Sequence, residues 1–398
     1  MLEFMEYVQQ AFYDTTHWDR ENSYSQLTAT ARDLLEFQTP RGFGLSLSSL
    51  SSPNFATSYA IGSVGLVDGS LSYLYTSRPL HASSQSGNVE LKSVIQGYRQ
   101  IQELRRRDEA WMWEEWHNGR RIDKRDSLFY GRLYLPQSTL EALYLSRLSP
   151  TQQVRLSAVS NSQMKNGATI LALHQYDVGK YSAETLYSTD GGLIGVRGLY
   201  NFGTDPRKEI REREPPRTED RFYGRFSAGA EMYYGSLNKS GGVSLGGRFA
   251  TLPAHSGTPL TATLTLNPLM GNISTTYAVK AGNNLALCSK FDFNVYSYES
   301  DLMLGCELWR MKARSPRVRE RSMAAKLEWR LDPFEEKATP EPEQVLGVLK
   351  ARVDQNWKIG LLWEGRVKEI LFALGSSIDM KRRDQPFRAI GLELQYSS

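Results

Sequence analysis

The feature that most constrains this chain is a two-residue alternation of apolar and polar side chains that begins near residue 27 and recurs to the C-terminus. In residues 260–266, leucine and alanine alternate strictly with threonine, so that one face is aliphatic and the other carries only hydroxyl groups. Successive side chains of a strand point to opposite faces of a sheet. The pattern therefore predicts strands with one apolar and one wet side.

The alternating segments are bounded by turn signals such as Asp190-Gly191-Gly192, and most are about ten residues long. That is about the length a tilted strand needs to cross the hydrocarbon core of a bilayer. Twenty strands are predicted, at residues 29–38, 41–50, 55–63, 66–77, 127–135, 139–148, 151–160, 168–177, 180–188, 192–201, 222–234, 240–250, 258–268, 271–281, 284–294, 301–310, 346–355, 357–367, 369–379 and 388–396.

Two architectures can use such strands: a soluble sandwich or propeller, and a membrane β-barrel. The mean hydropathy of −0.46 resembles that of a soluble protein, but alternating faces cancel the signal of barrel strands in any averaging window. Uniform strand length and continuous up-and-down spacing favour the barrel. It must close on itself, because no strand edge can stay unpaired in lipid. The fold class predicted is an all-β, transmembrane β-barrel.

The N-terminal residues follow another period. Met1, Phe4, Met5, Val8, Ala11 and Phe12 are spaced by three and four, which predicts an amphipathic helix. We therefore assign residues 1–26 to this helix and its lead-in, and residues 27–396 to the barrel, within one domain covering 1–398. Insertions interrupt the strands at 78–126, 202–221 and 311–345, and the first of them carries a helical pattern from Leu91 to Ile101.

Catalytic and metal-binding motifs are weak. Residues 242–246 match the Gly-x-Ser-x-Gly pattern of hydrolases, but no helix signal follows Ser244, and His255 is the one histidine downstream. The five histidines lack metal-ligand spacing. We therefore expect no enzyme, no cofactor and no metal site. A net charge of +4 is too small to indicate nucleic-acid binding.

Short runs along almost the whole chain carry a family resemblance. They are Ala11–Tyr13, Thr16–Trp18, Asn22–Tyr24, Gly69–Tyr75, Tyr130–Arg132, Arg147–Pro150, Gly257–Thr261, Phe291–Asn294, Glu299–Ser300, Gly305–Glu307 and Leu362–Gly365. Each run is weak alone, but in this order they closely resemble the fungal mitochondrial distribution and morphology barrels. The resemblance leaves out mainly the three insertions.

This resemblance implies a porin-like barrel of nineteen strands, in which an odd strand number is closed by a parallel first–last pair. One of the twenty predicted strands is then surplus, and we assign the surplus to 55–63, as a continuation of a neighbouring strand. The resemblance to porins also places residues 2–13 inside the lumen. A helix lying on the membrane surface is the alternative.

Two roles come with the family. In one, the barrel anchors the ER–mitochondria encounter structure (ERMES), which moves phospholipids between membranes, and its partners are the ER-anchored and lipid-transfer subunits. In the other, it belongs to the sorting and assembly machinery (SAM), with the core barrel of that machinery and a small import-translocase subunit as partners. The implied location is the mitochondrial outer membrane. From polar lumen faces alone, a conducting channel for metabolites or ions is the rival.

Two aromatic pairs are candidate partner sites. Tyr73 and Tyr75 share one strand face, as do Phe291 and Phe293. Each pair suits either a lipid-facing aromatic girdle or a docking anchor, since aromatic residues are favoured where a partner buries them. Both pairs lie within the family-like runs. We expect one pair to serve the assembly machinery and the other the tether.

Two further segments are candidates. Gly391, Leu394 and Tyr396 fit the sorting signal of barrel strands, although Ala389 stands at its polar position. A run of basic residues in the third insertion could attract anionic lipid head groups or an acidic partner, or be a solvated loop. Its members are Arg310, Lys312, Arg314, Arg317, Arg319 and Arg321.

Overall fold

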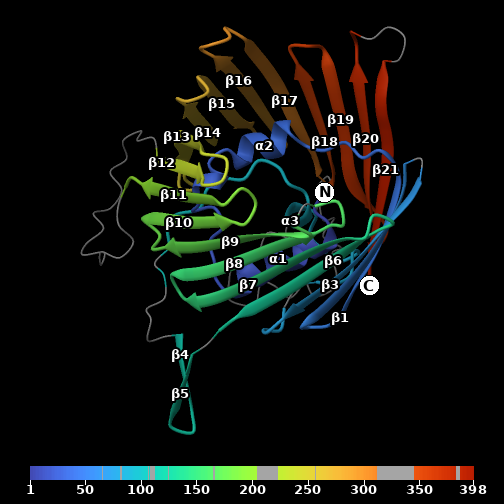
Figure 1. Ribbon diagram of the computed structural model, residues 1–398. Coiled ribbons are helices and arrows are strands. Elements are labelled where there is room, and N and C mark those ends of the chain that lie inside the picture. The colour runs from blue at the N-terminus through green and yellow to red at the C-terminus, as the bar shows by residue number, and fades with distance from the viewer. Residues whose placement is uncertain are drawn as a thin grey trace, which may run out of the picture.

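The computed structural model describes residues 1–64, 66–80, 83–105, 107, 113–123, 125–164, 166–203, 223–255, 257–311, 345–381 and 386–398. Within these residues, nineteen strands form a single closed barrel (Figure 1), which is the number that the family resemblance implies and one fewer than the alternation predicts. No helix of the described residues is both long enough and apolar enough to cross a membrane.

The first strands are β1 (Gly42–Ser52), β2 (Phe55–Val64), β3 (Leu66–Thr76), β6 (Ser127–Leu135), β7 (Thr139–Ser149), β8 (Gln152–Ser160), β9 (Ala168–Asp177), β10 (Tyr181–Ser188) and β11 (Leu193–Asn201). The remaining barrel strands are β12 (Gly224–Gly235), β13 (Ser240–Thr251), β14 (Leu260–Asn267), β15 (Asn272–Ala281), β16 (Leu285–Asn294), β17 (Ser300–Met311), β18 (Val345–Asp354), β19 (Lys358–Val367), β20 (Ile370–Asp379) and β21 (Phe387–Ser397). The helical segments are α1 (Phe4–Thr15), η1 (Tyr24–Gln26), α2 (Ala29–Leu35) and α3 (Leu91–Val94).

Neighbouring strands along the barrel chain are antiparallel, and the barrel closes through a parallel pair. Gly42 of β1 lies opposite Gly391 of β21, and the register continues to Ser48 opposite Ser397. Up-and-down strands in odd number bring the first and last strands together in the same direction, so that this pair must be parallel. Closure gives every barrel strand a neighbour on both sides, which satisfies the backbone in lipid.

The strand predicted at 29–38 is wrong. Residues 29–35 form α2, and the first barrel strand begins at Gly42 rather than near residue 27. The apolar residues Leu27, Ala31, Leu34 and Leu35 are buried and have helical spacing, which matches one helix face better than one strand face. The assignment of 55–63 as surplus is wrong as well, because β2 pairs with β1 on one side and β3 on the other.

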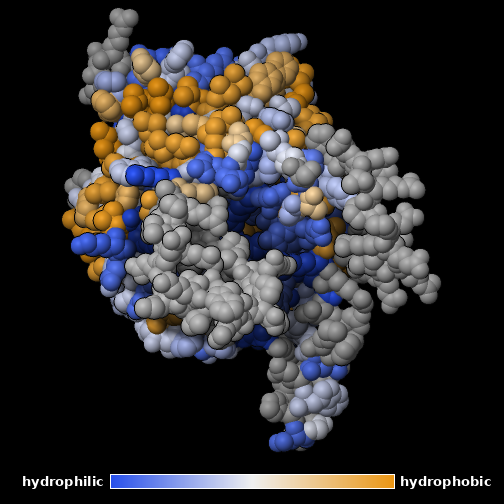
Figure 2. All heavy atoms as spheres, turned by 180° about the vertical axis from the view of Figure 1, so that it is seen from behind, coloured by the Kyte–Doolittle hydropathy of each residue, from blue (hydrophilic) through white to orange (hydrophobic). Residues whose placement is uncertain are grey.

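The alternation places apolar side chains outside and polar ones inside. In β14, Leu264 is 52% exposed on the outer wall, while Thr261 and Thr263 are buried against the lumen. Figure 2 shows apolar side chains gathered on the outer wall and polar ones lining the hollow between them. The wet side predicted for each strand is thus the lumen.

The two rims of the barrel differ. Because the strands alternate in direction, the connections after β3, β11 and β17 all leave from the rim where β21 ends. We call this the insertion rim, since it carries the three long insertions. The opposite rim, the turn rim, carries connections such as 189–192, 236–239, 268–271 and 295–299. From the first insertion a small hairpin, β4 (Glu114–His117) and β5 (Arg120–Asp123), projects away from the barrel (Figure 1).

Candidate partner-binding surfaces and the filled lumen

The N-terminal helix α1 lies in the lumen, as predicted. Its buried residues Met5, Val8 and Phe12 pack against Ala56 and Leu74, which point inward from β2 and β3. The inward-facing Arg132 Nη1 of β6 lies 2.6 Å from Glu3 Oε2. An apolar helix face and an ion pair therefore fix α1 to the inner wall.

A second segment of the lumen is the lumenal strap, which we define as residues 83–105. At one end Ser86 N donates to Ser397 O (3.1 Å). In the middle Tyr98 N donates to Glu307 Oε2 (3.1 Å), and further along Arg225 Nη1 donates to Gln102 O (3.0 Å). The strap thus runs along the inner wall from β21 past β17 to β12, held largely through its backbone.

The helical pattern from Leu91 to Ile101 is only partly realised, since α3 ends at Val94. Beyond it the backbone bonds to wall side chains instead of to itself: Lys350 Nζ donates to Gln96 O, and Glu307 accepts from Tyr98 N. Gly97 between them sits so close to the Glu307 carboxylate that a Cβ there would overlap it. Hydrogen bonds to charged side chains of the wall therefore take the place of the backbone hydrogen bonds that a second helical turn would make.

The helix α2 fills the other half of the lumen. Leu34 and Leu35 are buried with Ala278 of β15 and Cys288 of β16. The α2 carbonyl of Leu35 accepts from Arg352 Nη1 (2.8 Å). The apolar face of α2 is thus covered by strands β15 to β18.

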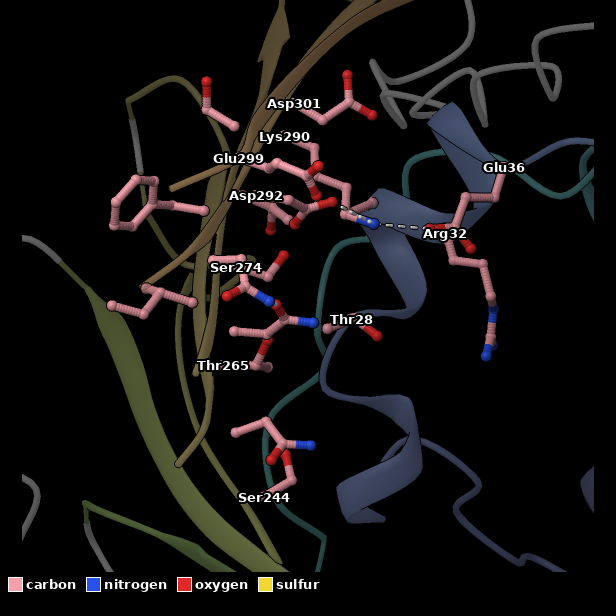
Figure 3. Close-up of a pocket in the computed structure, with 18 of the residues that line it drawn as sticks. Thr28, Arg32, Glu36, Ser244, Thr265, Ser274, Lys290, Asp292, Glu299 and Asp301 are labelled. Carbon is pink, nitrogen blue, oxygen red and sulfur yellow. Dashed lines mark hydrogen bonds and ion pairs between the residues drawn. The ribbon is translucent and has the colours of Figure 1, made fainter. Parts of the chain in front are cut away.

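A polar cavity of about 820 Å³ separates the other face of α2 from the inner wall. Figure 3 shows Glu36 on the helix side joined to Lys290 on the strands, with Ser274, Asp292 and Asp301 along the wall; Thr28 and Arg32 also line the cavity. Lys290 Nζ bridges Glu36 (3.0 Å) and Asp292 (3.3 Å). Thr265, Asn267 and Asn272 line it near the turn rim. The lumen is thus partly hollow towards that rim.

Several carboxyls of the lead-in and the lumenal helices are partly removed from water. Burial raises the pKa of Asp14 in α1 and of Asp33 in α2 above the ordinary value of 3.8, and the positive charge of Arg99 opposes this effect at both. Burial likewise raises the pKa of Glu21 above 4.5. Burial thus shifts these three acids in the direction of the neutral form, because a charged group loses hydration there.

Tyr73 and Tyr75 point outward from β3 near the insertion rim, where they are 42% and 49% exposed. The structure adds rings from neighbouring strands: Phe55 stacks on Tyr73 with centroids 6.0 Å apart, and Phe129 lies 6.5 Å from Tyr75. Tyr144 of β7 lies 4.8 Å from Phe129. Together these five rings form what we call the β3 aromatic patch.

The β3 aromatic patch is concave. It borders a shallow groove of about 380 Å³ whose lining includes Gly131, Ala142 and Ala158. These three small residues lie opposite one another across β6, β7 and β8. Rings at the edge and small residues at the floor give the outer wall a shaped recess rather than a smooth girdle.

Phe291 and Phe293 point outward from β16 near the turn rim, and Phe291 is 44% exposed. Their cross-strand neighbours are Thr275 and Leu302 for Phe291 and Ile273 and Ser300 for Phe293. The predicted pair is thus flanked by aliphatic and hydroxyl side chains.

Sequence reasoning missed two tyrosines beside this second pair. Tyr296 and Tyr298 lie in the turn from β16 to β17 and are 67% and 80% exposed. Tyr296 Oη donates to Pro268 O of the adjoining turn (3.0 Å), which holds the two turns together. Two tyrosines within the five-residue turn 295–299 were the available signal, since turns favour small and polar residues.

The two predicted pairs lie far apart. Seven strands separate β3 from β16 in one direction around the barrel and ten in the other. They also lie at opposite rims. The structure therefore does not bring Tyr73 and Tyr75 together with Phe291 and Phe293 into one site.

The C-terminal strand has the predicted orientation, with Leu394 and Tyr396 outward and Gly391 inward. Packing alone already requires glycine at position 391: a Cβ there would lie 2.4 Å from the Pro40 carbonyl, where the chain enters β1. In the predicted run of basic residues, Arg310 lies near the end of β17 at the insertion rim and is exposed. Lys312, Arg314, Arg317, Arg319 and Arg321 lie outside the described residues.

No hydrolase site accompanies Ser244 in the part of the chain that is described. Its hydroxyl bonds to Tyr24 Oη (2.7 Å) and joins the lead-in to the wall. Across the same described residues, no group of three or more histidine, cysteine, aspartate or glutamate side chains could hold a metal ion.

The sequence has full-length relatives. The sequence model of a family described as mitochondrial distribution and morphology protein 10 matches residues 1–337 and 317–398. A protein of that description from Sclerotinia sclerotiorum is 74% identical over 400 residues and all of both chains. Those from Phaeosphaeria nodorum and Podospora anserina are 60% and 50% identical, again over all of both chains. The similarity thus extends through the insertions as well as the strands.

Proposed function

Because this chain belongs to the mitochondrial distribution and morphology protein 10 family, we propose that it is a non-enzymatic scaffold of the mitochondrial outer membrane. The relatives' name supports a role in mitochondrial distribution and morphology, and the barrel supports a location in a mitochondrial membrane. The scaffold would anchor the ER–mitochondria encounter structure at ER contact sites, where phospholipids are exchanged. It would also assist the sorting and assembly machinery in assembling barrel proteins such as the import channel.

The observation that carries this proposal is the contrast between a filled lumen and two separate exposed aromatic surfaces. The helices α1 and α2 and the lumenal strap occupy the interior, while the β3 aromatic patch and Phe291 face outward. Exposed aromatic anchors at opposite rims suit two partners that bind one barrel independently. We assign one to the ER-anchored and lipid-transfer subunits, and the other to the assembly core barrel and the small translocase subunit.

Affinity purification from gently solubilised outer membranes tests this assignment. We expect the double substitution Tyr73→Ala with Tyr75→Ala to lose one set of partners, and Phe291→Ala with Phe293→Ala to lose the other. Tyr181 and Tyr187, exposed on the outer face of β10, supply the matched control when both are changed to alanine. Recovery of neither tether nor assembly subunits with the unaltered protein would refute the proposal.

The rival is a conducting channel, which the polar cavity of about 820 Å³ favours. The three lumenal segments oppose it, since they occupy the path between the rims. We expect the purified barrel to give no large stable conductance in a planar bilayer. A porin-like conductance from the unaltered protein would make the channel the better interpretation.

A further inference from the structure

Several partly buried arginines of the inner wall meet a carboxylate or several carbonyls. Arg197 of β11 contacts Glu184 (3.6 Å) and Glu231 (3.3 Å). Arg366 Nη1 of β19 donates to three strap carbonyls at 2.7–3.3 Å. This is the ordinary solution for charges removed from water, because an uncompensated buried charge is costly.

Arg225 and Arg248 depart from this rule. They point inward from the adjacent strands β12 and β13, two residues apart in register, and are only 7% and 4% exposed. Among the described residues each makes one hydrogen bond: Arg225 Nη1 to Gln102 O (3.0 Å) and Arg248 Nη1 to Gln26 O (3.2 Å). In the described part of the chain, no carboxylate lies within ion-pair distance of either guanidinium.

Three donor atoms of this pair are left over. Arg225 Nε, Arg248 Nε and Arg248 Nη2 are buried and have no hydrogen-bond partner among the described residues. Buried polar groups are almost always bonded, so such a cluster of unmatched donors calls for an explanation. Two neighbouring guanidinium groups also repel each other, which adds to the cost of leaving them without a counter-charge.

The nearby acids are poor counter-charges. Asp19 and Glu21 act on Arg248 and Arg225 only at longer range, and burial raises the pKa of Glu21 towards its neutral form. Ser227, which lies opposite Arg248, donates to Asn201 Oδ1 (2.7 Å), and among the described residues it accepts from none of the three unpaired N–H donors. The donors therefore lie in a region of positive charge next to the lead-in and the strap, whose Gln26 and Gln102 carbonyls contact the two arginines.

We propose that Arg225 and Arg248 bind one phosphate-class oxyanion inside the lumen, near the insertion rim. A tetrahedral oxyanion presents several acceptor oxygens in different directions, which matches unpaired N–H groups that come from two guanidinium groups. Arg225 is the second residue of β12 and Arg248 lies near the end of β13, so both lie close to the insertion rim. The anion would also join wall, lead-in and strap, because Gln26 and Gln102 are held by the same two arginines.

The phosphate has two sources: free inorganic phosphate and the head group of an anionic phospholipid at the rim. The full-length barrel, purified in detergent and stripped of phosphate, is titrated with radiolabelled inorganic phosphate against sodium chloride of equal ionic strength. We expect saturable binding that Arg248→Gln weakens about tenfold or more, the loss expected for charge-assisted hydrogen bonds. Arg225→Lys keeps the charge but loses Nε–H, and we expect a smaller loss.

Arg197→Gln is the matched control, because Arg197 is also an inward arginine but already has carboxylate partners. We expect it to bind phosphate as the unaltered protein does. A second arm places the barrel in phosphatidylcholine nanodiscs with or without phosphatidic acid, in phosphate-free buffer, and reads the bound lipid by native mass spectrometry.

Retention of phosphatidic acid, lost in Arg248→Gln, assigns the head group as the source, whereas binding of inorganic phosphate alone assigns the free ion. If the unaltered barrel binds neither inorganic phosphate nor phosphatidic acid, the proposal is overturned. This outcome does not depend on whether the variants fold. It is also overturned if binding is saturable but Arg248→Gln and Arg197→Gln reduce it equally, because the site would then lie elsewhere.

Discussion

The outer wall and the lumen of this barrel are built on opposite principles. On the wall, large apolar side chains such as Leu264 and Phe291 stay about half exposed. In the lumen, by contrast, Glu307 and Glu364 are fully buried and Lys350 is 2% exposed. The wall is an apolar surface that lipid completes, whereas the lumen is a second core in which charges hold separate chain segments together. Substitutions should therefore lower stability inside and alter partner binding outside.

The largest effect is expected from Glu364→Ala. Glu364 of β19 lies 3.4 Å from Lys350 Nζ of β18 and also accepts from the Met1 amino group. Its removal leaves a buried lysine without its carboxylate, which costs about 3–5 kcal/mol. The free energy of unfolding in detergent, from urea titration followed by tryptophan fluorescence, measures this loss.

The double substitution Glu364→Leu with Lys350→Met provides the control. It removes the buried lysine together with its carboxylate, so that only the Met1 amino group loses a partner, and it should cost less than Glu364→Ala alone, which leaves both cations without one. A Glu364→Ala barrel as stable as the unaltered one would contradict the view of the lumen as a charged core.

The same leucine-to-alanine substitution can be made in the lumen and on the outer wall, which allows the two regions to be compared directly. Leu34 of α2 is 1% exposed inside the lumen, while Leu264 of β14 is 52% exposed on the wall. We expect Leu34→Ala to lower the free energy of unfolding by about 2–5 kcal/mol, because it leaves a cavity. We expect Leu264→Ala to cost less than about 1 kcal/mol, because lipid or detergent fills the space. Equal losses in the same urea titration would erase the distinction between wall and core.

Gly391→Ala separates packing from sorting in the last strand. The added Cβ would overlap the Pro40 carbonyl, so we expect impaired closure of β1 on β21, with a loss of about 1–3 kcal/mol. Refolding of pure protein into detergent micelles, read as heat-modifiable gel mobility, needs no sorting machinery. Gly242→Ala is the control, since a Cβ there meets nothing within 4 Å. Normal refolding with failed insertion into isolated mitochondria would favour the sorting signal instead.

The sequence allowed the wall to be predicted well. Nineteen predicted strands match strands of the structure, and the outward placement of Tyr73, Tyr75, Phe291 and Phe293 follows from alternation alone. A period of two is a local property that lipid on one side and a polar lumen on the other enforce at every strand. The prediction failed at 29–38, where apolar residues at helical spacing were taken for a strand.

The lumen could not be predicted in the same way. The partners of the strap, such as Glu307 for Tyr98, lie about two hundred residues away and meet it only once the barrel closes. The rings that surround Tyr73 and Tyr75 come from β2, β6 and β7, and their register is likewise set by pairing. Contacts that arise from strand pairing and barrel closure produce no periodic pattern in the sequence, so that periodicity alone cannot predict them.

The smallest expected effect concerns the titration of one lumenal acid, Asp33 of α2. Burial raises its pKa above 3.8, so the native barrel keeps a proton that the unfolded chain loses first. The stability from this proton is present below about pH 3.8 and is lost as the pH rises through the raised pKa. Asp33→Asn cannot titrate, and we expect it to be more stable than the unaltered barrel at pH 7.

The advantage of Asp33→Asn should shrink on acidification and vanish below about pH 3.8, where both side chains are neutral. A tenfold change in proton affinity corresponds to about 1.4 kcal/mol, so urea titrations at several pH values resolve the trend. Glu299→Gln, in the exposed turn between β16 and β17, is the same carboxyl-to-amide exchange outside α2 and serves as the control substitution. An advantage independent of pH would mean that the lumen around α2 is hydrated like the rims, and that it is not a second core.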